Sequence, residues 1–160
     1  MTNHPQPIDP YYTTKKELIE RKLDLLDLQD GDFLCDLGSG DGRALIAGCE
    51  RADTKAVGYE ILDEALQDAA QNIEIANLTD RIELQQENFY ELDLSGFNTF
   101  VRYLTRNSLG GLSEKLENEL KSGTRIVTET FDILAWTYKE KETGILSDGS
   151  EYETYLYIVD

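Results

Sequence analysis

Three glycines at alternate positions constrain this chain more than any other feature. Gly38, Gly40 and Gly42 stand in the segment DLGSGDGR, between a short apolar run and a helical pattern. Glycine permits a positive φ and lets a ligand approach the backbone, and the free N–H groups at a helix start attract an electronegative group. The segment therefore predicts a strand–turn–helix unit that binds a nucleotide-like ligand, with a purely structural turn as the alternative.

The remainder of the chain alternates between helical and strand-like patterns. Helices are predicted over residues 14–28, 41–52, 62–78 and 112–123, with Thr14 as the cap of the first and Gly123 near the end of the last. Strands are predicted over residues 32–38, 55–61, 81–89, 98–104 and 124–131. The tail predicts an antiparallel hairpin, formed by residues 131–141 and 151–160 around Ser147, Asp148 and Gly149.

This alternation predicts an α/β fold, with a doubly wound, Rossmann-like, mostly parallel seven-stranded sheet and a C-terminal antiparallel hairpin. In such a sheet, ligands bind at the carboxyl ends of the strands near the switch point. The length of 160 residues suits one domain. We expect an N-terminal arm over residues 1–14, because all three prolines fall in the first ten residues, and a single domain over residues 15–160.

The charge balance is strongly acidic. The chain has 32 acidic against 15 basic residues and a net charge of −17, which argues against unaided binding to a phosphate backbone. Two interpretations remain open: a solvated surface suited to a salty cytoplasm, or a surface that attracts cationic partners such as lysine-rich proteins.

Other composition features limit the class of protein. No apolar stretch is long enough for a membrane span, and the first residues lack the apolar core of a signal peptide. Cys35 and Cys49 lie inside predicted elements, which favours a reducing cytoplasm over a disulfide framework. His4 is the single histidine, so we predict neither a metal site nor a histidine-based triad.

The second half of the ligand signal is Glu60, which ends the second predicted strand. An acid at this position accepts hydrogen bonds from ribose hydroxyls, although an exposed strand-end carboxylate is the alternative. The ligand is either a dinucleotide or S-adenosylmethionine. Asp36, two residues before the first glycine, favours the latter, because its carboxylate suits the ammonium of a methionine moiety and would repel a pyrophosphate. The terminal hairpin also favours a methyltransferase sheet.

The segments DLGSGDGR, AVGYEI and ENFYELDL resemble motifs of class I S-adenosylmethionine-dependent methyltransferases. More narrowly, the length and the segments PYYTT, NFYELDL, KLENELKSGTRIV and YETYLYIV resemble the small archaeal protein lysine methyltransferases. These are related to the ATP synthase c-subunit and Dot1-type lysine methyltransferases. The similarity runs from about Pro10 to the end of the chain.

The resemblance implies roles for individual residues. Residues that would contact the cofactor S-adenosylmethionine are Thr14, Asp36, Gly38, Ser39, Gly40, Gly42, Glu60, Ile61, Asn88 and Phe89. Among these, Asp36 and the first two glycines would meet the methionine part, Glu60 the ribose, and Ile61, Asn88 and Phe89 the adenine. The aromatic side chains of Tyr11, Tyr12 and Tyr103 would form the walls of a catalytic channel for the acceptor lysine. Departures from the family pattern are Thr13 and Lys15, where prolines are usual, and the polar Asn98 and Arg102.

The sequence thus predicts an enzyme that methylates lysine side chains of proteins by in-line transfer to a neutral amine. The alternatives are a small-molecule N- or O-methyltransferase and a non-catalytic S-adenosylmethionine-binding scaffold. We expect protein partners that carry lysines, no nucleic acid, no membrane, a monomer and a cytoplasmic location.

Overall fold

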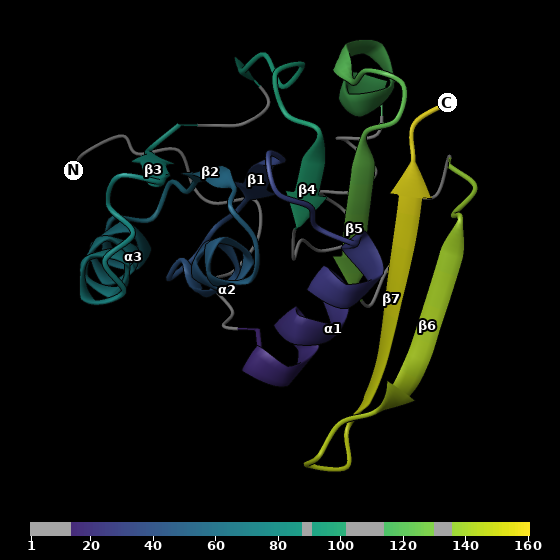
Figure 1. Cartoon of the computed structure of the whole chain (residues 1–160), viewed down its shortest axis with the longest axis horizontal. Helices are drawn as coiled ribbons and strands as arrows, with labels where there is room; N and C mark the ends of the chain where they lie inside the picture. Colours follow the sequence, from purple (N-terminus) through teal and green to yellow (C-terminus); the bar gives the residue numbers. More distant parts are fainter. Residues whose placement is uncertain (1–13, 88–90, 102–113, 130–135) are drawn as a thin grey trace, which may run out of the picture.

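The computed structural model describes residues 14–87, 91–101, 114–129 and 136–160, which contain one seven-stranded sheet. The strands are β1 (Phe33–Leu37), β2 (Lys55–Tyr59), β3 (Ile82–Gln85), β4 (Thr99–Val101), β5 (Arg125–Glu129), β6 (Glu140–Ile145) and β7 (Glu151–Ile158). Their order is β3-β2-β1-β4-β5-β7-β6 (Figure 1). The first five strands in this order are parallel, and β7 runs antiparallel to both β5 and β6.

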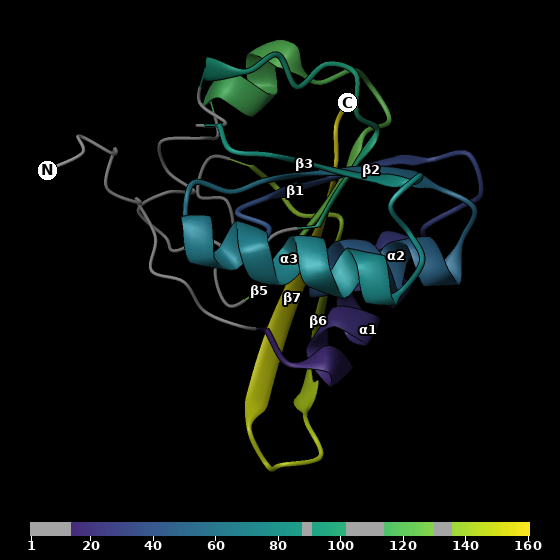
Figure 2. The ribbon, with the colours of Figure 1, turned by 90° about the vertical axis from the view of Figure 1, so that its left-hand side faces the viewer.

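Helices cover both faces of the sheet. The helices α1 (Lys16–Leu26), α2 (Arg43–Arg51) and α3 (Asp63–Ile75) lie on one face, and a helix over residues 114–119 lies on the other (Figure 2). The predicted fold class, a doubly wound mostly parallel sheet with an antiparallel C-terminal hairpin, is therefore confirmed. No helix among the described residues has the length and apolar character that a membrane span requires.

The sheet separates two apolar cores, because successive strand side chains point to opposite faces. Leu34, Val101, Val127 and Leu156 pack on the α1–α2 side. Their immediate neighbours Cys35, Phe100, Ile126 and Tyr157 pack on the opposite side, against Leu116 and Leu120. Burial on both faces explains why the central strands are continuous apolar runs in the sequence.

The hairpin has the expected turn, but its first strand is displaced from the prediction. The amide of Gly149 donates to the carbonyl of Leu146 at 2.9 Å, and β6 begins at Glu140 rather than at residue 131. Residues 136–139 are not strand, and residues 130–135 lie outside the described part. In a hairpin with a tight turn, the residues on either side of the turn pair with each other. The first strand therefore has to end directly at the turn, and β6 ends at Ile145, which pairs with Glu151. Trp136 instead packs edge-on against Tyr157 in the core, with ring centroids 6.1 Å apart.

The predicted capping role of Thr14 is wrong. Helix α1 has Lys15 at its N-cap, without a side-chain cap hydrogen bond. The Thr14 hydroxyl instead donates to Oε1 of Glu129, at the end of β5, at 3.4 Å. Glu17, the expected capping-box acid, accepts hydrogen bonds from the amide and hydroxyl of Ser147 in the hairpin turn. Tertiary partners have therefore replaced the local capping bonds.

Candidate active site

The glycine loop turns over the C-terminal ends of β1 and β2. The amides of Gly38 and Ser39 both donate to the carbonyl of Tyr59, at 2.8 and 3.1 Å. Gly38 has a φ of 88°, in the left-handed region that favours glycine. Gly42 begins α2 with a φ of 82°, and an added Cβ there would lie 3.2 Å from the Cβ of Ala69 on α3. The loop therefore needs glycine for its backbone conformation and for its close approach to α3.

Glu60 follows β2 and closes the loop from the other side. Its Oε1 accepts a hydrogen bond from the amide of Gly40 at 3.0 Å. Its Oε2 accepts from the amides of Ile61 and Leu62, at 2.9 and 3.2 Å. The side chain is buried, and three backbone donors hold its carboxylate at the end of the sheet. The alternative of an exposed strand-end carboxylate is therefore wrong.

Burial also affects the residue before Glu60. Tyr59 is 6% exposed and packs edge-on against Phe97, with ring centroids 6.3 Å apart. This burial raises the pKa of the Tyr59 phenol to about 12. The strand that precedes Glu60 is thus anchored by an aromatic side chain that is neutral at physiological pH.

A small cavity joins most of the predicted residues for the methionine end of the cofactor. It has a volume of about 30 Å³, and Thr14, Asp36, Gly38, Ser39 and Gly40 all line it. Asp36 is buried at 4% exposure. The hydroxyl of Ser39 is buried and has no hydrogen-bond partner among the described residues. The structure thus places residues from α1, β1 and the glycine loop around one polar space.

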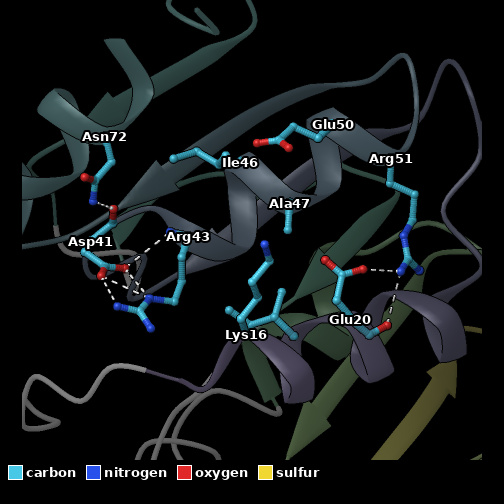
Figure 3. Close-up of a pocket in the computed structure, with 10 residues that line it drawn as sticks. Lys16, Glu20, Asp41, Arg43, Ile46, Ala47, Glu50, Arg51 and Asn72 are labelled. Carbon is cyan, nitrogen blue, oxygen red and sulfur yellow. Dashed lines mark hydrogen bonds and ion pairs between the residues drawn. The ribbon is translucent and has the colours of Figure 1, made fainter. Parts of the chain in front are cut away.

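Arg43, the last residue of the DLGSGDGR segment, connects the loop to the start of α1. Its guanidinium donates to both carboxylate oxygens of Asp41, and Nη1 donates to the carbonyl of Thr14 at 3.0 Å. The side-chain amide of Asn72 donates to the carbonyl of Asp41 at 3.0 Å (Figure 3). The sequence did not predict a role for Arg43, because its position in the motif does not show that its guanidinium reaches the backbone of Thr14.

Figure 3 also shows residues that line a wider groove between α1 and α2, beside Arg43. The groove has a volume of about 550 Å³. It is lined by charged and apolar side chains, including Lys16, Glu20 and Ala47. Neither Glu60 nor the glycines of the loop line this groove, so its volume does not make it the candidate active site.

Two further charged residues border the candidate site. Lys22 from α1 lines the small cavity, and its Nζ lies 3.5 Å from Oε2 of Glu129 on β5. The sequence did not predict a role for either residue. The available signals were a lysine on the apolar face of a predicted helix and an acid at the end of a buried strand, near the position that Glu60 takes directly after β2.

The other predicted residues are only partly described. Ile61 is half-buried beside Glu60, and its carbonyl accepts from the side-chain amide of Gln86 at 3.1 Å. The remaining predicted residues lie outside the described part of the chain, and they are Tyr11, Tyr12, Asn88, Phe89 and Tyr103.

The fold, the glycine loop and the strand-end acid define this protein as a class I methyltransferase. Residues 36–140 match the family model of the ANTKMT methyltransferase domain. The chain belongs to this family, and the resemblance stated from its motifs is confirmed.

Relatives agree with this assignment. A protein-lysine N-methyltransferase of Saccharolobus islandicus is 37% identical over 155 residues, which cover 96% of this chain and 95% of that protein. The adenine nucleotide translocase lysine N-methyltransferase of Mus musculus is 28% identical over 142 residues, covering 89% of this chain and 60% of that protein. An RNA methyltransferase from Salinibacter ruber, solved in complex with S-adenosyl-L-homocysteine, superposes with a TM-score of 0.84. It is 30% identical, and the match covers 92% of this chain and 94% of that one.

The described residues fit S-adenosylmethionine, the cofactor that this family implies. An ionised carboxylate has about four lone-pair sites, so Glu60 retains acceptor capacity for a ligand hydroxyl beside its three amide donors. Asp36 lines a cavity that Gly38 and Gly40 of the glycine loop also line. A carboxylate there suits an ammonium group and disfavours a pyrophosphate.

Proposed function

We propose that this protein transfers the methyl group of S-adenosylmethionine to lysine side chains of proteins. The observation that supports this acceptor best is the 37% identity, over nearly the full length of both chains, to the protein-lysine N-methyltransferase of Saccharolobus islandicus. The described site agrees, since it offers a cradle for the cofactor. A methyl transfer to an amine needs alignment and desolvation more than it needs an acid–base pair.

In this proposal the described residues hold the cofactor from its two ends. Asp36, Gly38 and Gly40 bind the methionine part, with Thr14 and Ser39 beside them at the same cavity. Glu60 accepts from the ribose, and Ile61 packs near the adenine, while Gly42 lets the loop approach α3 closely. Asn88 and Phe89 complete the adenine site as a proposal from the sequence alone.

When bound, S-adenosylmethionine would supply a sulfonium methyl group that a neutral amine can attack in line, so that the N–C bond forms as the C–S bond breaks and S-adenosylhomocysteine leaves as a neutral thioether. A lysine has an ordinary pKa of about 10.4, so it must lose its proton before it can attack. Burial between aromatic walls lowers the pKa of an amine and tolerates the methylated cation. We propose Tyr11, Tyr12 and Tyr103 as these walls, with the arm over residues 1–14 covering the site.

Methylation of RNA is the second candidate, because the Salinibacter ruber protein is called an RNA methyltransferase. The charge of this chain disfavours it. With 32 acidic against 15 basic residues, the surface repels a phosphate backbone and attracts lysine-rich proteins. A single soluble domain that works as a monomer in the cytoplasm is the simplest setting for this activity, and it is part of the proposal.

The acceptor is identified by incubating the protein with radiolabelled S-adenosylmethionine and, separately, a lysine-rich protein, total RNA or a small-molecule extract. We expect label in the protein fraction, and mass spectrometry to find methyl groups on lysines. At limiting cofactor, Glu60→Ala should reduce labelling about tenfold or more, whereas Glu64→Ala, which removes an exposed acid on α3, should not change it. Label confined to RNA or to small molecules would overturn the lysine acceptor and leave the methyltransferase assignment intact.

A further inference from the structure

Lys22 and Glu129 form an ion pair that is almost completely buried, which is unusual for two charged side chains. Both side chains are 2% exposed, and the Nζ–Oε2 distance is 3.5 Å. Lysine and glutamate are almost never fully buried unless they are paired, and an apolar pair of similar size is often equally or more stable. Stability alone therefore gives little reason for two charges at this place.

The location of the pair relates it to the candidate active site. Lys22 lines the small cavity together with Asp36 and the loop residues Gly38 and Gly40. A volume of about 30 Å³ exceeds the roughly 10–15 Å³ that one water needs, so the cavity has room for a small polar group. Lys22 approaches this space from α1, on the side of the sheet that carries the glycine loop.

Arg43 is the other cation at the cavity, but it is paired with Asp41 and is more exposed than Lys22. Its guanidinium donates to both carboxylate oxygens of Asp41 and to the carbonyl of Thr14, and its side chain is 41% exposed. The side chain of Lys22, by contrast, is 2% exposed, and the attraction between opposite charges is stronger away from water. Lys22 is therefore the cation better placed to meet an anionic group in the cavity.

The free α-amino acid end of S-adenosylmethionine carries an ammonium and a carboxylate. Asp36 supplies the charge that suits the ammonium, and a buried cation at the same cavity suits the carboxylate. We infer that Lys22 binds the carboxylate of the cofactor's amino-acid end, and that Glu129 orients Lys22 as a positioning residue. This inference rests on the proposed use of S-adenosylmethionine and does not depend on the methyl acceptor.

The test compares two ligands that differ only at the amino-acid end. S-adenosylhomocysteine carries that end, whereas 5′-methylthioadenosine has the same nucleoside thioether without it. Calorimetry measures both affinities for the wild type, Lys22→Met and the double variant Lys22→Met/Glu129→Gln. The double variant removes both members of the buried ion pair, so it keeps the test valid where the single variant unfolds because Glu129 has lost its partner. Lys16→Met, an exposed lysine on the same helix, is the matched control.

We expect the double variant to bind S-adenosylhomocysteine about tenfold or more weakly, in line with the loss of a hydrogen bond to a charged group. Its affinity for 5′-methylthioadenosine should stay within about twofold of wild type, a change of less than half a kcal/mol. An unchanged affinity for S-adenosylhomocysteine, or an equal loss for both ligands, would overturn the inference. Wild-type protein that binds neither ligand would instead remove the proposed cofactor, and this inference with it.

Discussion

The backbone amide of Gly40 donates to the carboxylate of Glu60 at 3.0 Å, which joins the glycine loop after β1 to the residue that follows β2. The same carboxylate accepts from the amides of Ile61 and Leu62. One buried side chain thus fixes the shape of the loop and is also the proposed acceptor for the ribose of the cofactor.

The first prediction concerns this carboxylate. Glu60→Ala leaves three amides without their acceptor, so we expect the free energy of unfolding to fall by about 1–3 kcal/mol. We expect the affinity for S-adenosylhomocysteine to fall about tenfold or more, as measured by calorimetry. Glu64→Ala should change neither quantity. Unaltered affinity in a folded Glu60→Ala protein would show that the carboxylate only shapes the loop.

The second prediction concerns close packing beneath the loop. A Cβ added at Gly58 would lie 2.6 Å from Cδ1 of Leu45 and 2.7 Å from Cβ of Ser39. Gly58→Ala should therefore destabilise the protein by about 1–3 kcal/mol through overpacking, and it should weaken cofactor binding because Ser39 must move. Denaturant unfolding and calorimetry measure the two effects. Gly96→Ala is the control, because a Cβ there meets no atom within 4 Å. Equal stability of the two variants would contradict the packing argument.

The third prediction is a loss of stability in alkali that depends on Tyr59. Burial raises the pKa of this phenol to about 12, from an ordinary value of about 10. Above about pH 10 the unfolded chain releases the proton while the folded chain keeps it, so stability falls between about pH 10 and 12. The loss attributable to Tyr59 is on the order of 2 kcal/mol.

Tyr59→Phe should flatten this part of the stability curve, measured as unfolding midpoints in denaturant between about pH 8 and 12. Tyr138→Phe, which removes a phenol that is 42% exposed, should leave the curve as in the wild type. Burial also raises the pKa of the Cys49 thiol, which acts with the same sign from lower pH. The contribution of Tyr59 is therefore the difference between the stability curves of the wild type and Tyr59→Phe. Parallel curves for Tyr59→Phe and wild type would refute the assignment to Tyr59.

The fourth prediction concerns the net charge of −17. If the acidic surface recruits basic substrates, salt should raise the KM for a lysine-rich protein and leave kcat nearly constant, because exposed charges are screened beyond about 10 Å at 0.1 M salt. Steady-state kinetics at increasing NaCl measure this change. A neutral peptide with a single lysine is the control and should respond weakly. A KM for the lysine-rich protein that is constant or falls with salt would favour a surface adapted to a salty cytoplasm.

The sequence by itself determined the elements and the glycine loop, because these depend on local patterns. Alternating helical and strand-like segments predicted the sheet and its covering helices, and burial on both faces made the central strands continuous apolar runs. The sequence predicted Gly38, Gly42 and Glu60 because left-handed turns require glycine and because an acid directly after a predicted strand is visible in the sequence.

Only the tertiary structure decided which distant residues meet. Thr14 looked like a helix cap, yet its hydroxyl donates to Glu129, since a partner from another element can replace a local hydrogen bond at similar free energy. The predicted first strand of the hairpin began too early because it included the apolar Trp136. This side chain packs against Tyr157 in the core, and the strand begins only at Glu140. The pairing of Lys22 with Glu129 joins α1 to β5 across most of the chain. No local pattern encodes such a contact, because it arises only when the sheet brings the end of β5 over the buried face of α1.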